Sequence, residues 1–141
     1  METSHFHPMV VHFPIALLIV GFVTDFVGMI IKKEKGFTKT GTYLLIIGVI
    51  GSLAAYLTGE FFTKEYEGNL SELKELHEII SKIAVFTAIS VAVIRLYIIH
   101  KKKDNTNLKW FVFTLYFITV IFIAYSGYLG GSLVYDFILK T

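Results

Sequence analysis

Long runs of apolar residues alternate with short polar islands along the whole chain. Four runs, approximately 9–31, 43–62, 79–99 and 110–135, contain few charged residues. Each is about as long as the roughly 20 helical residues that cross a hydrocarbon core. Helices satisfy their own backbone hydrogen bonds in lipid, and the runs lack the alternation of barrel strands. The pattern predicts an all-α, up-and-down bundle of four membrane-spanning helices, forming one domain over residues 1–141.

Composition agrees with a membrane environment. Hydrophobic residues make up 55% of the 141 residues, and the mean hydropathy is +0.67, as is typical of membrane proteins. The first run lacks a basic start and a small-residue cleavage site, so it does not resemble a removable signal peptide. We expect a multi-pass protein of the cytoplasmic (inner) membrane that contacts lipid.

Lysines mark the links on one side of the predicted bundle. The link after the first run and the link after the third run carry Lys32, Lys33, Lys35, Lys39, Lys101, Lys102, Lys103 and Lys109. The middle link is rich in glutamate instead. The positive-inside rule places the first and third links in the cytoplasm, and both termini with the middle link outside. The net charge of +2 reflects this asymmetry, and no nucleic-acid partner is predicted.

Cysteine is absent from the sequence. Its absence excludes disulfides, thiolate metal sites and cysteine-ligated iron–sulfur clusters. Any metal must therefore bind histidine, carboxylate or carbonyl groups. The sequence also lacks a nucleophile–base motif and a phosphate-binding loop.

The third helix is expected to begin outside the hydrocarbon. In NLSELKELHEIISKIA the apolar residues recur at helical spacing from Leu70, and Asn69 with Glu72 forms a candidate N-cap. At 100° per residue, His77 and Arg95 share one face, which otherwise carries small side chains. Such a face turns toward other helices rather than lipid, so both side chains are expected to point inward.

Glycine and tyrosine recur near the outer ends of the second and fourth helices. The sequence from Tyr56 to Gly59 resembles the sequence from Tyr128 to Gly131. Each follows a lysine-rich link and an odd-numbered helix with a histidine at its outer mouth, the order that a duplicated two-helix unit would give. Small residues at this spacing let helices approach closely or leave room for a flat ligand.

Two histidines at matching depth predict a haem site. In an up-and-down bundle the first and third helices lie diagonally opposite, roughly 11–14 Å apart when neighbouring axes are about 8–10 Å apart. His12 and His77, reaching inward, would be the axial ligands of a b-type haem. The residues expected to line the ring are Gly59, Gly131, Tyr56 and Tyr128.

Other readings of the histidines stay open. His7 replaces His12 as the ligand if Pro14, which removes a helical hydrogen bond and is expected to kink the helix, turns it the other way. A haem-free zinc, copper or iron site is a second reading, since imidazole binds all three metals. That site would use His7, His12, His77 and Glu60. Plain structural packing is the third reading.

Asp25 and Arg95 lie late in two helices that both run from the outer to the inner side. Charges inside membranes are usually paired, so an ion pair of structural importance is predicted. On a straight helix Asp25 lies about 140° from His12, and both cannot face the bundle axis. Either Pro14 changes the helical phase or one of these faces meets a second subunit in a homodimer.

The motifs at the two ends of the chain resemble those of a known family. HPMVVHFPIALL at residues 7–18, a histidine opening the third span, and GYLGGSLVY at residues 127–135 are similar to an uncharacterised bacterial four-span membrane family marked by HPxxVHFPIAL and GGxLVY. The matching positions are His7, Pro8, His12, Phe13, Pro14, His77, Gly130, Gly131, Leu133 and Tyr135.

The resemblance covers nearly the whole chain. It implies an association with redox proteins, because some relatives are joined to Rieske or cytochrome modules. It therefore implies electron exchange at the outer face with a quinone or a redox protein such as a cytochrome. Relatives often continue past LVY with a basic, histidine-containing stretch. This chain departs from that pattern, since it continues with Asp136, Phe137 and Ile138.

The lysine asymmetry predicts a topology that reporter fusions can measure. Alkaline phosphatase fused to either terminus should be active, because the positive-inside rule places both termini outside the cytoplasm. A fluorescent reporter that folds only in the cytoplasm should be bright when inserted into the first or third link. A cytoplasmic location for either terminus would contradict this topology.

Overall fold

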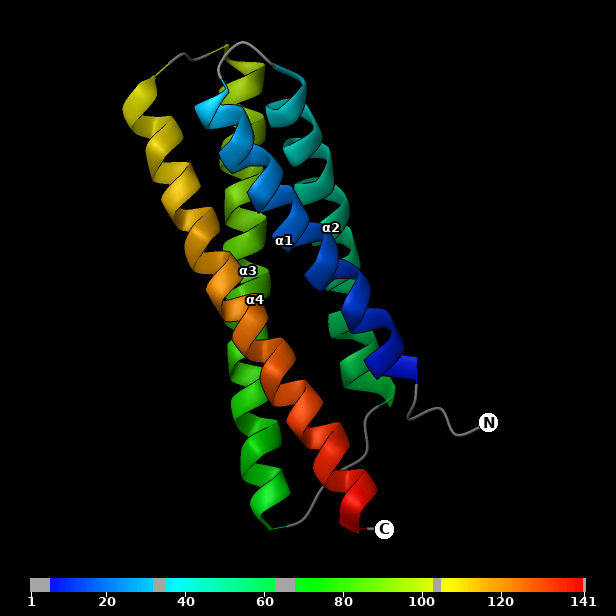
Figure 1. Cartoon of the computed structure of the whole chain (residues 1–141). Helices are drawn as coiled ribbons and strands as arrows, with labels where there is room; N and C mark the ends of the chain where they lie inside the picture. The colour runs from blue at the N-terminus through cyan, green and yellow to red at the C-terminus, as the bar shows by residue number, and fades with distance from the viewer. Residues whose placement is uncertain (1–5, 32–34, 63–67, 103–104, 141) are drawn as a thin grey trace.

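The computed structural model describes residues 6–31, 35–62, 68–102 and 105–140. It contains four long helices (Figure 1): α1 (Phe6–Ile30), α2 (Lys35–Phe62), α3 (Asn69–His100) and α4 (Thr106–Lys140). Each is long and apolar enough to cross a membrane, and the described residues contain no strand. The predicted all-α, four-span bundle is confirmed. α1 begins and α4 ends at the same end of the bundle, while the side of the membrane that this end faces stays a prediction.

α3 begins one residue before Leu70, where its apolar residues start to recur at helical spacing. Its first residue is Asn69, and Gly68 occupies the N-cap position with φ 64° and no side-chain cap. The expected Asn69 cap is therefore wrong, because Asn69 is already helical. Positive φ is a conformation that glycine adopts without a steric penalty, so Gly68 suits this turn.

Large apolar side chains face outward along the bundle. They include Phe13 on α1, Ile50 on α2, Phe86 on α3 and Phe111 on α4, all of which are exposed. Exposed apolar side chains on every helix are expected where the surrounding solvent is hydrocarbon. The outer surface of this multi-pass membrane protein therefore contacts lipid.

The helices pack as two hairpins, α1–α2 and α3–α4, with closer packing within each hairpin than between them. Glycine allows the close approach of α1 and α2. A Cβ on Gly48 would lie 2.6 Å from Leu18 Cγ, and a Cβ on Gly41 would lie 3.0 Å from the Gly21 carbonyl oxygen. Larger residues at these positions would push the two helices apart.

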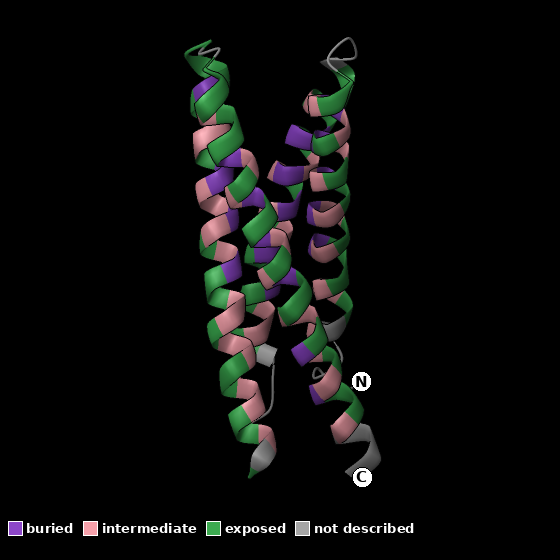
Figure 2. Ribbon diagram, turned by 60° about the vertical axis from the view of Figure 1, so that its left-hand side comes forward, coloured by how far each residue is buried: buried purple, intermediate pink, exposed green. Residues whose placement is uncertain are grey.

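Buried residues gather on the inner faces of the four helices (Figure 2). Leu18 and Leu45 of the first hairpin meet Val91, Val112 and Tyr116 of the second in this core. The Tyr116 side chain is fully buried and donates its hydroxyl to the Leu18 carbonyl at 2.9 Å. A buried hydroxyl needs such a partner, and this one ties α4 to α1. Figure 2 also shows the two hairpins separating toward the end that carries the first and third links.

Asp25 of α1 and Arg95 of α3 form the predicted ion pair across the hairpin interface. The Arg95 guanidinium donates to the Asp25 carboxylate, and the two side chains are 13% and 1% exposed. Asp25 Oδ1 and Arg95 Nε are buried without a hydrogen-bond partner among the described residues. A Cβ on Gly41 would lie 3.1 Å from Asp25 Cβ, so this glycine makes room for the carboxylate.

Removing one partner of the Asp25–Arg95 pair should destabilise the protein more than removing both. Asp25→Ala or Arg95→Ala alone should lower the free energy of unfolding by about 3–5 kcal/mol, because each leaves a buried charge unpaired. The double variant should lose clearly less than the sum. Unfolding titrations in detergent micelles measure the wild type, the two single variants and the double variant.

The more accessible pair Lys74 and Glu78, whose side chains are 22% and 44% exposed and 3.6 Å apart on α3, provides the control. Alanine substitutions there should show a coupling of about 0.5 kcal/mol or less, since water screens exposed ion pairs. A coupling between Asp25 and Arg95 no larger than this control would rule out an energetically important pair.

Candidate functional site

His7 of α1 and His77 of α3 lie beside each other at the end of the bundle where α1 begins. Their ring centroids are 6.5 Å apart and their planes make an angle of 74°. Both residues are half-buried. Because they come from different hairpins, this histidine pair spans the hairpin interface.

α2 orients the His7 ring. His7 Nδ1 lies 3.1 Å from Thr58 Oγ1, and the same hydroxyl donates to the Ala55 carbonyl at 2.9 Å. The single hydroxyl proton is engaged with Ala55, so the hydroxyl accepts from His7 and the proton of the imidazole is on Nδ1. A Cβ on Gly59 would lie 3.0 Å from His7 Cε1. The absence of a side chain at Gly59 therefore makes room for the ring.

α4 orients the His77 ring in the same way. His77 Nδ1 lies 3.0 Å from the Ser126 carbonyl oxygen, which can only accept, so this ring also has its proton on Nδ1. In a helix, that carbonyl also faces the amide of Gly130, four residues later. A Cβ on Gly130 would lie 3.2 Å from His77 Cε1. Glycine at this position leaves the carbonyl accessible to the imidazole.

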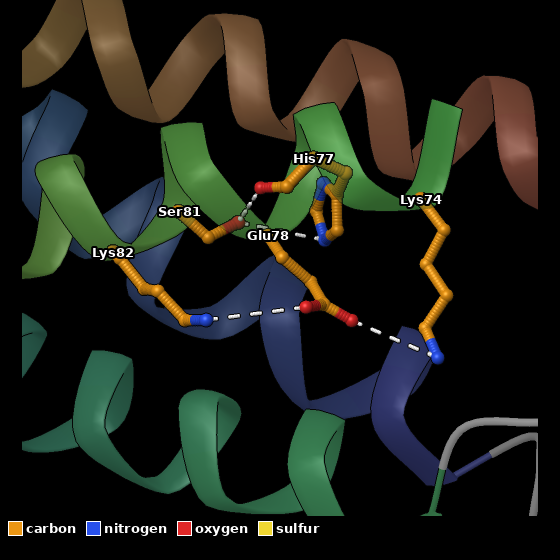
Figure 3. A network of polar contacts seen from close by, with 5 residues as sticks. All are labelled: Lys74, His77, Glu78, Ser81 and Lys82. Atoms are coloured by element: carbon orange, nitrogen blue, oxygen red, sulfur yellow. Dashed lines mark hydrogen bonds and ion pairs between the residues drawn. The ribbon is translucent and has the colours of Figure 1, made fainter. Parts of the chain in front are cut away.

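Serine and charged residues surround His77 on α3 (Figure 3). Ser81 Oγ donates to the His77 carbonyl at 2.7 Å and lies 2.7 Å from Ser126 Oγ. Glu78 forms ion pairs with Lys74 at 3.6 Å and Lys82 at 3.9 Å. Its carboxylate is thus engaged by these two amines, and the polar contacts of the ring itself are with serines.

Both imidazoles are therefore held with a proton on Nδ1 and a lone pair on Nε2. Metal-binding histidines in proteins have this arrangement, with the second nitrogen fixed by an outer hydrogen bond. His7 precedes the membrane-spanning segment Met9–Ile30. Burial lowers the pKa of His7 below its ordinary value, and the nearby His77 lowers it further. His7 is consequently neutral at pH 7, the form that a metal requires.

The histidine pair and the ion pair are two ends of one interface. Asp25 lies 18 positions after His7, and Arg95 lies 18 positions after His77. Since 18 residues make about five full helical turns, each odd-numbered helix presents its histidine and its charged residue on the same face. The two hairpins thus meet through equivalent positions of α1 and α3, five helical turns apart.

His12 does not share this face. It is exposed on α1, five residues and about 140° from His7. The expectation that His12 points inward toward His77 is corrected, because His7 is the α1 histidine that lies beside His77. α1 continues through Pro14, which is buried 3.3 Å from the Cβ that Gly51 would carry. One helical phase accounts for the buried positions on both sides of Pro14, so a second subunit is not needed to explain them.

The glycines of the site differ by one residue from the expected set. Gly59 contacts His7 as described, but the glycine of α4 that contacts a histidine is Gly130. Gly131 is exposed, and a Cβ there would have no atom within 4 Å. The short sequence match paired Gly131 with Gly59, whereas the packing pairs Gly130 with it. In both helices the space holds an imidazole ring.

The remaining predicted residues lie at the edge of the site. Tyr56 and Tyr128 are 39% and 70% exposed, and Glu60 is exposed. Tyrosines are typical of the membrane–water interface. Among the described residues, no three His, Cys, Asp or Glu side chains come close enough to hold a metal ion together. The predicted four-residue metal cluster is therefore not assembled in this structure.

Thr58 and Ser126 orient the two imidazoles, and sequence reasoning missed both roles. The available signal was spacing, because each residue lies within one turn before a glycine on the inner face of its helix. Periodicity places such residues on a face. It does not show which carbonyl or hydroxyl meets a ring on the neighbouring helix.

Comparison with known proteins assigns this chain to a family but to no characterised relative. No curated protein and no solved structure matches it. The model of a family described as "Predicted membrane protein (DUF2231)" matches residues 3–141, a range that includes all four helices and the histidine pair. The chain therefore belongs to the DUF2231 family of predicted membrane proteins.

Proposed function

We propose that this chain is a redox protein that binds b-type haem between His7 and His77, near the outer face of the cytoplasmic membrane. The observation that supports this most directly is the pair of imidazoles on opposite hairpins, each with its Nδ1 proton in a hydrogen bond. Each Nε2 then carries a lone pair rather than a proton, and the Nε2 of His77 lies 3.5 Å from Ser81 Oγ. A porphyrin supplies the equatorial nitrogens of iron, so two axial imidazoles complete its coordination.

The spacing of the two rings suits this role. An imidazole nitrogen about 2.1 Å from a metal ion places the ring centroid about 3 Å from that ion. Two rings on opposite sides of one metal would therefore have centroids about 6 Å apart. The centroids of His7 and His77 are 6.5 Å apart, a separation that is compatible with axial ligation by both rings.

A haem held by these residues would lie between the two hairpins. Its plane would stand across the line from His7 to His77, which connects α1 with α3. Packing between hairpins is looser than packing within them. The interface between the hairpins would therefore admit the haem more easily than the interface within either hairpin. The nearby exposed tyrosines support a position of its edge close to the headgroup layer, where propionates would meet water.

A single haem at this depth supports electron exchange at the outer face rather than transfer across the bilayer. The partner we propose is a quinone from the membrane or a cytochrome at the outer surface. At the inner end, the described residues include one histidine, His100, which is exposed. A second bis-histidine haem is therefore not part of this proposal.

A haem-free transition-metal site is the second candidate. One observation favours it: the spaces beside Gly59 and Gly130 are occupied by the imidazole rings themselves. A copper, zinc or iron ion bound between two Nε2 atoms needs no room for a porphyrin. Water or an external ligand would complete its coordination, because no third metal-binding side chain joins the pair within the described part of the chain.

Protein purified after expression with ample haem should show a low-spin Soret band and sharp visible bands on reduction. His7→Ala and His77→Ala should each abolish this spectrum or convert it to high spin, because each removes one axial ligand. His12→Ala and His100→Ala should leave it unchanged, since both side chains are exposed. Absorption spectroscopy with metal analysis measures each variant.

The adjacent glycines of α4 provide a matched pair of steric controls. Gly130→Ala places a methyl group 3.2 Å from His77 Cε1 and should weaken the low-spin spectrum, whereas Gly131→Ala meets open space and should not. Protein without Soret absorbance that retains stoichiometric zinc or copper through His7 and His77 would replace haem with the metal-ion site. Protein that binds neither would overturn both proposals.

A further inference from the structure

We infer that Thr58 is a positioning residue that selects the coordinating nitrogen of His7 and raises its basicity. The effect on a bound metal rests on the function proposed above. The choice of nitrogen is a property of the chain alone and can be measured without any metal. The inference is carried by two hydrogen bonds that meet at one hydroxyl group.

The Thr58 hydroxyl connects the His7 ring to the backbone of α2. It donates to the Ala55 carbonyl at 2.9 Å and lies 3.1 Å from His7 Nδ1. A hydroxyl has one proton and can accept through its lone pairs. With that proton directed at Ala55, His7 must donate from Nδ1, and Nε2 is left with its lone pair.

The second hairpin achieves the same result without a hydroxyl. His77 Nδ1 reaches the Ser126 carbonyl directly at 3.0 Å. Ser126 lies four residues before Gly130, the glycine against which the His77 ring packs. The residue just before that glycine is Leu129, whose side chain has no hydrogen-bonding atom. His77 is therefore oriented by the backbone alone.

α2 has the same arrangement with one added step. Ala55 lies four residues before Gly59, the glycine against which the His7 ring packs. The residue just before Gly59 is Thr58, and its hydroxyl contacts both the Ala55 carbonyl and the imidazole. The orientation of His7 thus depends on a side chain, so it can be changed by a single substitution.

The hydrogen bond from Nδ1 has a chemical effect at Nε2. A proton donated to an outer acceptor raises the basicity of the coordinating nitrogen. A more basic ligand favours ferric over ferrous iron and lowers the midpoint potential. Loss of the Thr58 acceptor should therefore raise the midpoint potential, through His7 only.

Thr87 on α3 provides a control for the loss of a threonine hydrogen bond within a helix. Thr87 Oγ1 donates to the Ala84 carbonyl, three residues earlier, at 3.0 Å. Thr58 makes the same type of bond to Ala55, also three residues earlier. Substituting either threonine by valine removes an equivalent backbone contact, but only Thr58→Val removes a contact to histidine.

The first test is nitrogen NMR of protein labelled with 15N-histidine and prepared without haem. The His7 signals, assigned by their loss in His7→Ala, should show the proton on Nδ1 in the wild type and in Thr58→Ser. In Thr58→Val this preference should be weakened, because valine accepts no hydrogen bond and the backbone carbonyl of Ala55 is then the remaining acceptor near the ring. A wild-type His7 protonated on Nε2 would overturn the inference, whether or not any variant folds.

The second test is redox titration of the haem-loaded protein. Thr58→Val should retain a low-spin spectrum and show a raised midpoint potential, while Thr58→Ser and Thr87→Val should keep the wild-type value. A low-spin Thr58→Val protein with an unchanged potential would refute the effect of Thr58 on the metal and leave haem binding intact. Wild-type protein without haem would instead refute the proposed function, and the NMR measurement would still decide the role of Thr58.

Discussion

Lipid offers no hydrogen-bond partner, so each polar side chain on the inner faces of this bundle must find one within the protein. Asp25 meets Arg95, and Tyr116 meets the Leu18 carbonyl. His7 and His77 each donate to an oxygen on the next helix. Apolar packing alone holds a helix loosely in rotation about its own axis, because most apolar side chains fit either a neighbour or lipid. The polar contacts have directions and therefore set this rotation.

The rotation set by the ion pair determines which histidine reaches the interface. α1 is one continuous helix, and the residue five full turns before Asp25 is His7. α3 repeats this relation between Arg95 and His77. Pairing the charges near one end of the bundle thus brings the imidazoles together at the end where α1 begins, and the glycines at positions 59 and 130 let the rings fit there. The Asp25–Arg95 ion pair and the histidine pair are thus coupled through α1 and α3.

The fold was predictable because the length of an apolar run and the charge of a link are local properties of the sequence. The partnership of Asp25 and Arg95 was also predictable, since few charges lie within the spans and these two lie at similar depth. His12 was predicted as the ligand of the first helix because it matches His77 in depth, although the 18-residue spacing between His7 and Asp25 already contained the correct helical phase. The roles of Gly130 and Thr58 depend on the register of neighbouring helices to within a fraction of a turn. Periodicity along one helix does not contain that information.

Each hairpin carries one imidazole and orients it with its own second helix, so the two halves of the site are built separately and meet only when the hairpins associate. A metal atom bound by both rings would then link the two hairpins. A ligand at 100 times its dissociation constant stabilises the state that binds it by about 2.7 kcal/mol, and here that state is the closed pair of hairpins. By the same linkage, any lateral stress in the bilayer that spreads the hairpins would weaken the bonds to that atom. The site would in this way convert mechanical strain of the membrane into a change in metal affinity.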